Sequence, residues 1–431
     1  MAIANHNQRS NILFLFTDDQ HFRAVGAAGN REIRTPNMDW IARGGVHFTH
    51  CHVSNPISTP SRACVQTGQY GFRNGVTFFN QSIRPDAPRI AQALSNRGYQ
   101  TAFTGKWHND GRPCDHGFYL MRNVFLDGMH HYESIPVVQG ADDAPVEVPR
   151  HPSEVFTDGA LELLEKGCEE PFALFVWYTA PHDPRTPPEK YEALYPPERL
   201  SAPPNFMSAP PFDPGVLDLR DEKLMPRPLE SDAVKREIGR YYALLTHVDN
   251  QMGRILHRLQ ERGQLDNTVI FLAGDNGLSL GAHGLLGKQN MYEESVRVPL
   301  IVRGPGFQQK VRCDALVDLM DIMPTMCDIA GAPIPDSVQG RTLTPLLTGR
   351  RSKLRESIFC HYDDVFRMVR TPQHKLIHHL KTGREELFHT ENDPYEQNDV
   401  IESAVYSRVL GDLRTRLADW RKTLGDPTLE T

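Results

Sequence analysis

Short continuous runs of apolar residues recur along the chain, and each ends in a polar or glycine-rich segment. The clearest runs are 12–16, 172–178, 269–273 and 298–302. They have the length of strands but no alternation of apolar and polar positions, which is typical of strands covered on both faces. A further strand is expected at 99–103.

Helical periodicity is clearest after Ser231, where apolar residues recur every three or four positions until Gly263. Shorter helices are expected after Thr35 and at 90–94, and an amphipathic helix at 405–420. Strands that alternate with helices predict an α/β fold with a mostly parallel, doubly wound sheet.

The segment 340–349 is expected to mark a boundary between a catalytic domain, 1–345, and a smaller C-terminal subdomain, 346–431. Short apolar pairs at 368–369 and 376–377 predict a small antiparallel sheet there. Two segments are expected to be loops that carry substrate selectivity. One is 114–148, which has no sustained period, and the other is 184–226, whose first part is rich in proline.

Polar side chains follow four of the predicted strands directly. These side chains are Asp18 and Asp19, Lys106 and His108, His182, and Asp275 and Asn276. Each pair taken alone has an ordinary structural explanation, such as a turn or a helix cap for the two aspartates. Because ligands bind at the carboxyl ends of the strands in a doubly wound sheet, we expect these groups to meet at one edge.

The chemistry of this set favours a hard metal ion. Three aspartates and one asparagine offer oxygen ligands without cysteine, which suits calcium or magnesium better than zinc. Lys106 and His108, two apart at a strand end, are expected to turn to the same side. Lys106, Lys288 and Arg62 would hold the remaining negative charge of a bound anion.

Three hydroxyl residues surround Pro60 in the stretch 54–68. The pattern predicts a helix that begins near Pro60, with Ser58 in the loop at its mouth. The positive end of the helix dipole and the guanidinium of Arg62 would then suit an anion. An ordinary helix cap explains these residues equally well when they are taken alone.

Composition narrows the function class. The 431 residues are 39% hydrophobic and 23% charged, as in soluble globular proteins. The net charge of -7 argues against nucleic acid as the main partner. The seven cysteines are dispersed without a C-x-x-C pair, which indicates neither a disulfide framework nor a zinc site.

No apolar run reaches the length of a signal-peptide core or of a membrane span. A cytoplasmic protein without membrane association is therefore expected, or a periplasmic or secreted one if a signal peptide has been removed.

The motifs together resemble those of the sulfatase family within the alkaline phosphatase superfamily. The matching residues are Thr17-Asp18-Asp19, Ser58 to Arg62 with Thr67-Gly68, Gly105 to His108, Ala180 to His182, Asp266 to Thr268, Gly274 to Gly277, Gly287-Lys288, and Asp393-Pro394 with Glu396 and Asn398. They extend over nearly the whole chain. The resemblance implies a large mixed, mostly parallel sheet sandwiched by helices.

The resemblance also implies roles for these residues. Residue 58 would be oxidised by a formylglycine-generating maturation enzyme, and its hydrated aldehyde would attack the sulfur of a sulfate ester. Calcium would be bound by Asp18, Asp19, Asp275 and Asn276 with residue 58. Arg62, Lys106 and His108 would orient and activate the diol. Lys106, His182 and Lys288 would contact the sulfate, with His182 or Lys288 protonating the leaving oxygen, and His283 is a further candidate for substrate contact.

Three functions remain open at this point. The first is hydrolysis of a sugar, aryl or small-metabolite sulfate. The second is hydrolysis of phosphonate monoesters or phosphodiesters at the same site, since these esters carry the same single negative charge. The third is anion binding without catalysis by a protein with unmodified Ser58. A serine at this position fits the serine-type members of the family, but it would also result from replacing a native cysteine.

Overall fold

The computed structural model describes residues 9–429. The first eight residues, on which the expectation about a signal peptide partly depends, lie outside this range. Among the helices of the described residues, none combines the length and the apolar character needed to span a bilayer.

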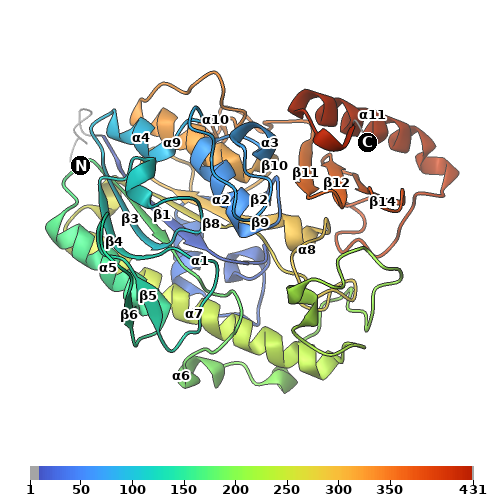
Figure 1. Ribbon diagram of the computed structural model, residues 1–431, viewed down its shortest axis with the longest axis horizontal. Helices are drawn as coiled ribbons and strands as arrows, with labels where there is room; N and C mark the ends of the chain where they lie inside the picture. The colour runs from blue at the N-terminus through green and yellow to red at the C-terminus, as the bar shows by residue number, and fades with distance from the viewer. Residues whose placement is uncertain (1–8, 430–431) are drawn as a thin grey trace.

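Eight strands form the central sheet of the protein (Figure 1). Their order is β10 (Val311–Asp318), β2 (Val46–His52), β9 (Arg297–Arg303), β8 (Thr268–Gly274), β1 (Asn11–Thr17), β7 (Phe172–Trp177), β3 (Gln100–Lys106) and β4 (Leu120–Phe125). Strand β9 pairs antiparallel with both of its neighbours, and all other pairings in this sheet are parallel. The predicted mixed, mostly parallel sheet is confirmed.

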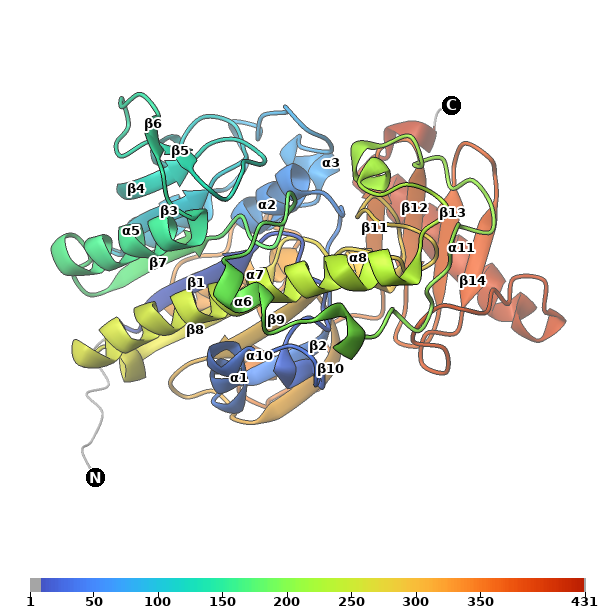
Figure 2. The same ribbon diagram turned by 90° about the horizontal axis from the view of Figure 1, so that it is seen from below.

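Alternate side chains of β1 enter two different cores. Phe14 and Phe16 pack in one core, and Leu13 and Leu15 pack in the other. Burial on both faces explains why the strand sequence is apolar without alternation. Helices α2, α4, α9 and α10 cover the first face, and α1, α5 and α7 cover the second (Figure 1). Figure 2, seen from below, shows the long helix α7 lying across the second face.

The helices vary widely in length. They are α1 (Pro36–Arg43), α2 (Ser58–Thr67), α3 (Gly71–Asn74), α4 (Ile90–Ser95), α5 (Pro152–Lys166), α6 (Glu189–Glu192), α7 (Ser231–Glu261), α8 (Glu293–Val296), α9 (Ile322–Ala330), α10 (Thr344–Leu347) and α11 (Ser407–Leu424). The 3₁₀ helices are η1 (Gly26–Ala28), η2 (Pro113–His116), η3 (Pro197–Arg199), η4 (Arg220–Lys223), η5 (Leu265–Asn267), η6 (Leu319–Asp321), η7 (Ala404–Tyr406) and η8 (Pro427–Leu429). Helix α7 confirms the periodicity predicted after Ser231.

A second, antiparallel sheet follows in the C-terminal part of the chain, as predicted. It consists of β11 (Ile358–Tyr362), β12 (Phe366–Arg370), β13 (Lys375–His379) and β14 (Glu385–Phe388). Helix α11 packs on β12 and β13. The division of the chain into two domains at residue 345 stays a prediction.

The expected loop at 114–148 is partly wrong. This segment contains β4 at the edge of the central sheet and the small hairpin of β5 (Ile135–Val137) and β6 (Val146–Val148). An edge strand has only one neighbour, and four of the six β4 residues are half-buried, so its sequence carries no continuous apolar run.

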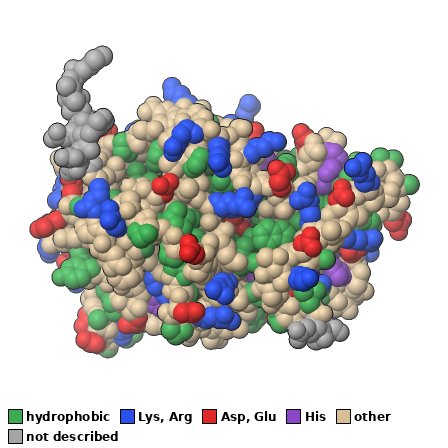
Figure 3. All heavy atoms as spheres, turned by 90° about the horizontal axis from the view of Figure 1, so that it is seen from above, with side chains coloured by type: hydrophobic (Ala, Val, Ile, Leu, Met, Phe, Trp, Pro, Cys, Tyr) green, Lys and Arg blue, Asp and Glu red, His purple; other side chains and the backbone are tan. Residues whose placement is uncertain are grey.

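On the surface seen in Figure 3, acidic and basic side chains are interspersed.

Candidate active site

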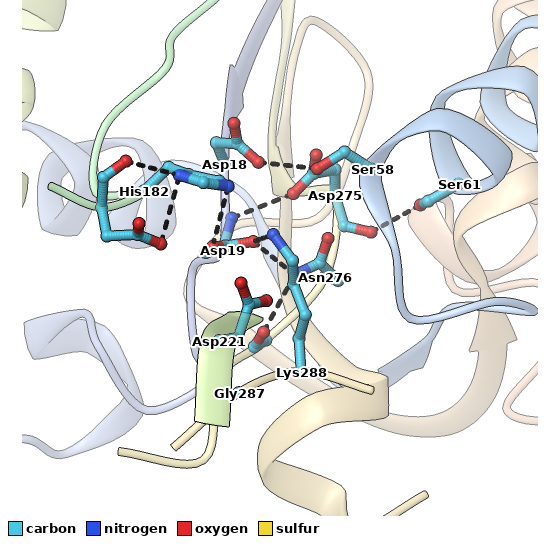
Figure 4. A network of polar contacts seen from close by, with 12 residues as sticks. Asp18, Asp19, Ser58, Ser61, His182, Asp221, Asp275, Asn276, Gly287 and Lys288 are labelled. Atoms are coloured by element: carbon cyan, nitrogen blue, oxygen red, sulfur yellow. Dashed lines mark hydrogen bonds and ion pairs between the residues drawn. The ribbon is translucent and has the colours of Figure 1, made fainter. Parts of the chain in front are cut away.

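Strands β8, β1, β7 and β3 are parallel neighbours, and their carboxyl ends therefore lie at one edge of the sheet. Asp275 and Asn276 follow β8, Asp18 and Asp19 follow β1, and His182 lies beyond β7. Figure 4 shows these side chains pointing toward one another. The structure thus brings together the groups that the sequence placed after separate strands. We call Asp18, Asp19, Ser58, Arg62, Lys106, Asp275, Asn276 and Lys288 the edge cluster.

Ser58 enters the edge cluster from the first turn of α2. The helix begins at Ser58 and not near Pro60, so the prediction that Ser58 lies in the preceding loop is wrong. Proline is tolerated in a first helical turn because its missing N–H would have no partner there. The Ser58 hydroxyl donates to Asp18 Oδ1 at 2.9 Å and is almost completely buried.

Asp18 is surrounded by positive charge. The Lys106 amine donates to its Oδ2, and the Arg62 guanidinium lies 3.8 Å from its Oδ1. Burial raises the pKa of this carboxyl, but the charges of Lys106, His182 and Arg62 together outweigh it and hold the pKa well below its usual value. Asp18 is therefore ionised at neutral pH.

The pKa of Asp275 is shifted in the opposite direction to that of Asp18. Burial and the negative charge of Asp18 raise its pKa to about 7, although Arg62 lies 2.9 Å from its Oδ2. The other oxygen of Asp275 accepts from the backbone N–H of Asp19 at 3.0 Å. Asp19 itself has a φ of 58°, a left-handed conformation that lets its amide and its carboxylate both face the cluster.

The Asp19 carboxylate accepts from two groups on other segments. The Lys288 amine and the Asn276 amide both donate to its Oδ1 at 2.6 Å. Burial lowers the pKa of Lys288, but Asp19 and Asp221 more than compensate, so the pKa is raised and the amine is charged. The cluster therefore holds three carboxylates and three cationic side chains, each at most 3% exposed.

The donor set fits a hard divalent metal ion. One oxygen from each of Asp18, Asp19 and Asp275 lies within 4.8 Å of the others. Asn276 Oδ1 is buried and has no hydrogen-bond partner. Three carboxylate oxygens and one amide oxygen are ligands typical of calcium and magnesium.

His182 lies beside Asp19, with Nε2 3.8 Å from Asp19 Oδ2. Its Nδ1 is 2.7 Å from the backbone oxygen of Asp183. Because a carbonyl oxygen can only accept, Nδ1 must carry a proton, which leaves Nε2 facing the cluster. The Tyr132 hydroxyl donates to the His182 carbonyl and fixes the backbone from the other side.

A short turn at the start of η4, residues 220–222, connects the two loops that carry His182 and Lys288. Arg220 binds both oxygens of Asp183, at 2.5 and 3.0 Å. Asp221 accepts from Gln289, the residue after Lys288, at 2.9 Å. Glu222 accepts from the backbone N–H groups of Leu286 and Gly287. We call residues 220–222 the clip.

The clip was not identified from the sequence. The only available signal was that an acid, Asp183, directly follows His182, and nothing in the sequence indicates its arginine partner across 37 residues. From the sequence, the segment 184–226 was expected to carry substrate selectivity, but no residue in it was named.

Two predicted site residues are placed differently from the rest. His108 lies beyond β3 with a φ of 51°, so it does not continue the extended geometry expected for Lys106 and His108. Among the described residues it makes no hydrogen bond to the edge cluster. Burial and the charges of Lys106 and Arg62 lower its pKa well below the usual value, so its imidazole is neutral.

His283 packs in a neighbouring set of residues. Its ring stacks on Tyr292 at 3.7 Å, and its Nε2 lies 2.9 Å from Asn205 Nδ2 and 3.6 Å from Glu294 Oε2. No described hydrogen bond or ion pair joins it to the edge cluster. Its expected contact with substrate stays a prediction.

Comparison with known proteins gives a consistent result. The sulfatase family model matches residues 10–332, and the model of the C-terminal region of N-sulphoglucosamine sulphohydrolase matches residues 281–423. The chain is 28% identical to N-acetylglucosamine-6-O-sulfatase of Bacteroides thetaiotaomicron, covering 97% of this chain and 87% of that protein. It is also 28% identical to an arylsulfatase of Clostridium perfringens, covering 94% and 93%.

Solved structures show the same architecture. A structure of a protein in complex with its substrate D-glucosamine-2-N,6-O-disulfate has a TM-score of 0.86 at 27% identity, covering 97% of this chain and 99% of that one. The phosphonate monoester hydrolase of Agrobacterium radiobacter shares the fold, with a TM-score of 0.80 at 23% identity and 96% of each chain covered. The family model matches most of the chain, and the protein therefore belongs to the sulfatase family and is a sulfuric ester hydrolase.

Proposed function

We propose that the protein hydrolyses a sulfate ester of a saccharide and releases inorganic sulfate. The observation that carries the proposal is the buried contact of Ser58 with Asp18 inside a cluster of three acids and three cationic side chains. Similarity to N-acetylglucosamine-6-O-sulfatase and to the protein in complex with a glucosamine disulfate supports a sugar as the alcohol part of the ester.

Two groups that the family implies would complete the site. Calcium, or magnesium with the same preference for oxygen, would be held by Asp18, Asp19, Asp275, Asn276 and residue 58, and it would polarise a sulfate oxygen. Formylglycine at position 58, made by a maturation enzyme, would supply a hydroxyl nucleophile. A divalent cation would also give this charge-balanced cluster a net positive charge, which favours an anionic ester.

The other residues of the site would then position residue 58, bind the sulfate and transfer a proton. Lys106 and Arg62, which already contact Asp18, hold the group at position 58 against the acids. Lys288 and His182 both lie beside Asp19, and we assign them contacts with the sulfate. His182, with its Nε2 facing the cluster, can hold the proton that the leaving sugar oxygen needs. His108 would help to orient residue 58, a role that rests on the resemblance to the family.

A second candidate is hydrolysis of phosphonate monoesters or phosphodiesters. The likeness in fold to a phosphonate monoester hydrolase favours it, and these esters carry one negative charge, as sulfate monoesters do. A third candidate is anion binding by unmodified Ser58 with a retained metal ion.

The decisive experiment compares sulfate release from sulfated sugars and aryl sulfates with the hydrolysis of phenyl phosphonate esters. The protein is produced together with a maturation enzyme, and intact-peptide mass spectrometry measures the loss of two hydrogens at residue 58. We expect oxidised protein to release sulfate and Ser58→Ala to be inactive. Oxidised protein that cleaves only phosphonate esters would establish the second candidate, and protein from its native host without oxidised residue 58 would favour the third.

A further inference from the structure

A cavity of about 710 Å³ lies beside the candidate active site, in the size range of small-molecule sites. In the described part of the chain, none of the edge cluster residues lines it. Its walls include residues 21–24 after β1, the middle of β2, residues 201–205, part of helix α7, Glu294 of α8, and residues 394–395 near the C-terminal sheet.

Arg23 places an unpaired positive charge on this cavity. Its guanidinium lies 4.0 Å from the ring centre of Tyr395 and 5.1 Å from that of Phe22. It forms no ion pair with any described residue. A guanidinium held over aromatic rings without a carboxylate remains available to an anionic group of a ligand.

Three other residues that line the cavity have polar atoms without a hydrogen-bond partner. The atoms are His47 Nδ1, Asn205 Oδ1 and Glu294 Oε2, and each of the three residues is at most 5% exposed. Glu294 Oε2 lies 3.6 Å from His283 Nε2, which is an ion-pair distance but beyond hydrogen-bond distance. Buried polar atoms of this kind are rare and costly unless a ligand or water satisfies them.

Glu294 Oε2 and Asn205 Oδ1 can only accept hydrogen bonds. Burial lowers the pKa of His47 to about 4, so its neutral ring has one nitrogen that donates and one that accepts. The Asn205 Nδ2 group lies 2.9 Å from Glu294 Oε1, the Tyr395 carbonyl oxygen and His283 Nε2, so it is the amide nitrogen, not Oδ1, that faces these groups. A matching ligand therefore brings several hydroxyl groups, which can donate or accept, together with one negative group.

We propose that this cavity is a second binding site, for a sugar ring that carries a carboxylate. The hydroxyls of the ring bond the three polar atoms, the carboxylate pairs with Arg23, and the ring packs among the aromatic side chains. The site is independent of the proposed reaction, because its residues are not those of the edge cluster. It allows the protein to hold an acidic saccharide at a point other than the scissile ester.

Calorimetric titration with methyl glucuronide tests the proposal, using methyl glucoside as the matched sugar without the carboxylate. The full chain is used, with inorganic sulfate saturating the edge cluster. We expect saturable binding of methyl glucuronide and at least about tenfold weaker binding of methyl glucoside. Arg23→Gln should weaken glucuronide binding by about tenfold, and the surface variant Arg43→Gln should leave it unchanged.

A second variant separates the hydroxyl contacts from the charge. His47→Phe removes one hydrogen-bonding ring nitrogen from the cavity and should weaken the binding of both sugars by a similar factor. Binding affinities are compared only for variants whose thermal unfolding midpoint equals that of the unaltered protein. The absence of saturable glucuronide binding to the unaltered protein would overturn the proposal, as would equal affinities of Arg23→Gln and the unaltered protein.

Discussion

At the scale of single residues, Asp275 shows how burial of the edge cluster changes the ionisation of a carboxylate. Burial and the charge of Asp18 raise its pKa to about 7, even with Arg62 in contact. Three carboxylates in one buried site repel one another more than the nearby cations can offset at Asp275. A divalent metal ion would relieve this repulsion, so metal binding and the ionisation of Asp275 should depend on each other.

The substitution Asp275→Ala is predicted to abolish both metal binding and activity. It removes one hard ligand and the carboxylate that contacts the Arg62 guanidinium most closely. Calcium titration of chelator-treated protein should show affinity reduced by at least about a hundredfold. The exposed Asp266→Ala serves as the matched control and should bind calcium normally. Calcium affinity retained in Asp275→Ala would refute the metal assignment.

At the scale of elements, the clip joins two loops that come from different strands. One 3₁₀ turn in the long segment between β7 and α7 holds Asp183 through Arg220, and the Lys288 loop through Asp221 and Glu222. His182 donates to the backbone of Asp183, so the position of its ring depends on that residue. The clip should therefore position His182 and Lys288 relative to each other without touching substrate.

Arg220→Ala should slow the reaction most for esters whose leaving oxygen needs a proton. The turnover number for an alkyl sugar sulfate should fall by about tenfold or more, since general acids contribute at least about a hundredfold. The loss for 4-nitrophenyl sulfate should be much smaller, because nitrophenolate leaves without protonation. Arg240→Ala, a half-exposed residue of α7, is the control.

The comparison of the two esters distinguishes an error in the role proposed for Arg220 from an error in the proposed function. An equal loss for both esters would assign Arg220 a structural role only. Protein that hydrolyses no sulfate ester before substitution would instead contradict the proposed function.

Elements with one dominant pattern were predictable from the sequence. Strands β1, β7 and β8 are buried on both faces, and α7 has one continuous apolar face, so each has a clear sequence signal. Strands β2 and β10 were not predicted. Strand β2 has three histidines among seven residues, and β10 alternates exposed and half-buried positions over its first half. Such mixtures match neither a buried strand nor an amphipathic one.

The candidate site was predictable where its residues follow strands. The topology of a parallel sheet alone brings Asp18, Lys106, His182 and Asp275 to one edge. The clip was not predictable, since Arg220 meets Asp183 through the path of a long irregular segment. Hydrophobic periodicity gives no information on such a path.

At the scale of the whole molecule, buried polar residues connect the two sheets. Lys375 on β13 pairs with Glu293 of α8 at 2.8 Å and with Glu396 at 2.6 Å. His361 on β11 donates its backbone N–H to Ser54, just before α2. Its ring stacks on Phe72 of α3 at 4.2 Å, and neither ring nitrogen has a hydrogen-bond partner. These contacts form the joint between the sheets, and they include the His361 imidazole, which must remain neutral.

Burial and the charge of Arg367 lower the pKa of His361 to about 3. In the unfolded chain the pKa of histidine is about 6.5, so the unfolded state takes up the proton first as the pH falls. The stability associated with neutral His361 is fully present above about pH 6.5 and is lost progressively toward about pH 3. His52, whose pKa is lowered to about 4 chiefly by burial, adds to this loss.

His361→Phe should make the protein less sensitive to acid. The phenyl ring keeps the stacking on Phe72 and carries no group that protonates. A histidine that is protonated only in the unfolded state lowers the unfolding free energy by about 1.4 kcal/mol for each pH unit below its unfolded pKa. Between about pH 6 and about pH 5, the variant should therefore lose about that much less unfolding free energy than the unaltered protein. Urea unfolding at the two pH values measures the difference, with the exposed His257→Gln as the control that keeps the original slope. If His361→Phe and the unaltered protein lost the same free energy, His361 would have to be hydrated or protonated in the folded state, and the joint between the sheets would be open to water.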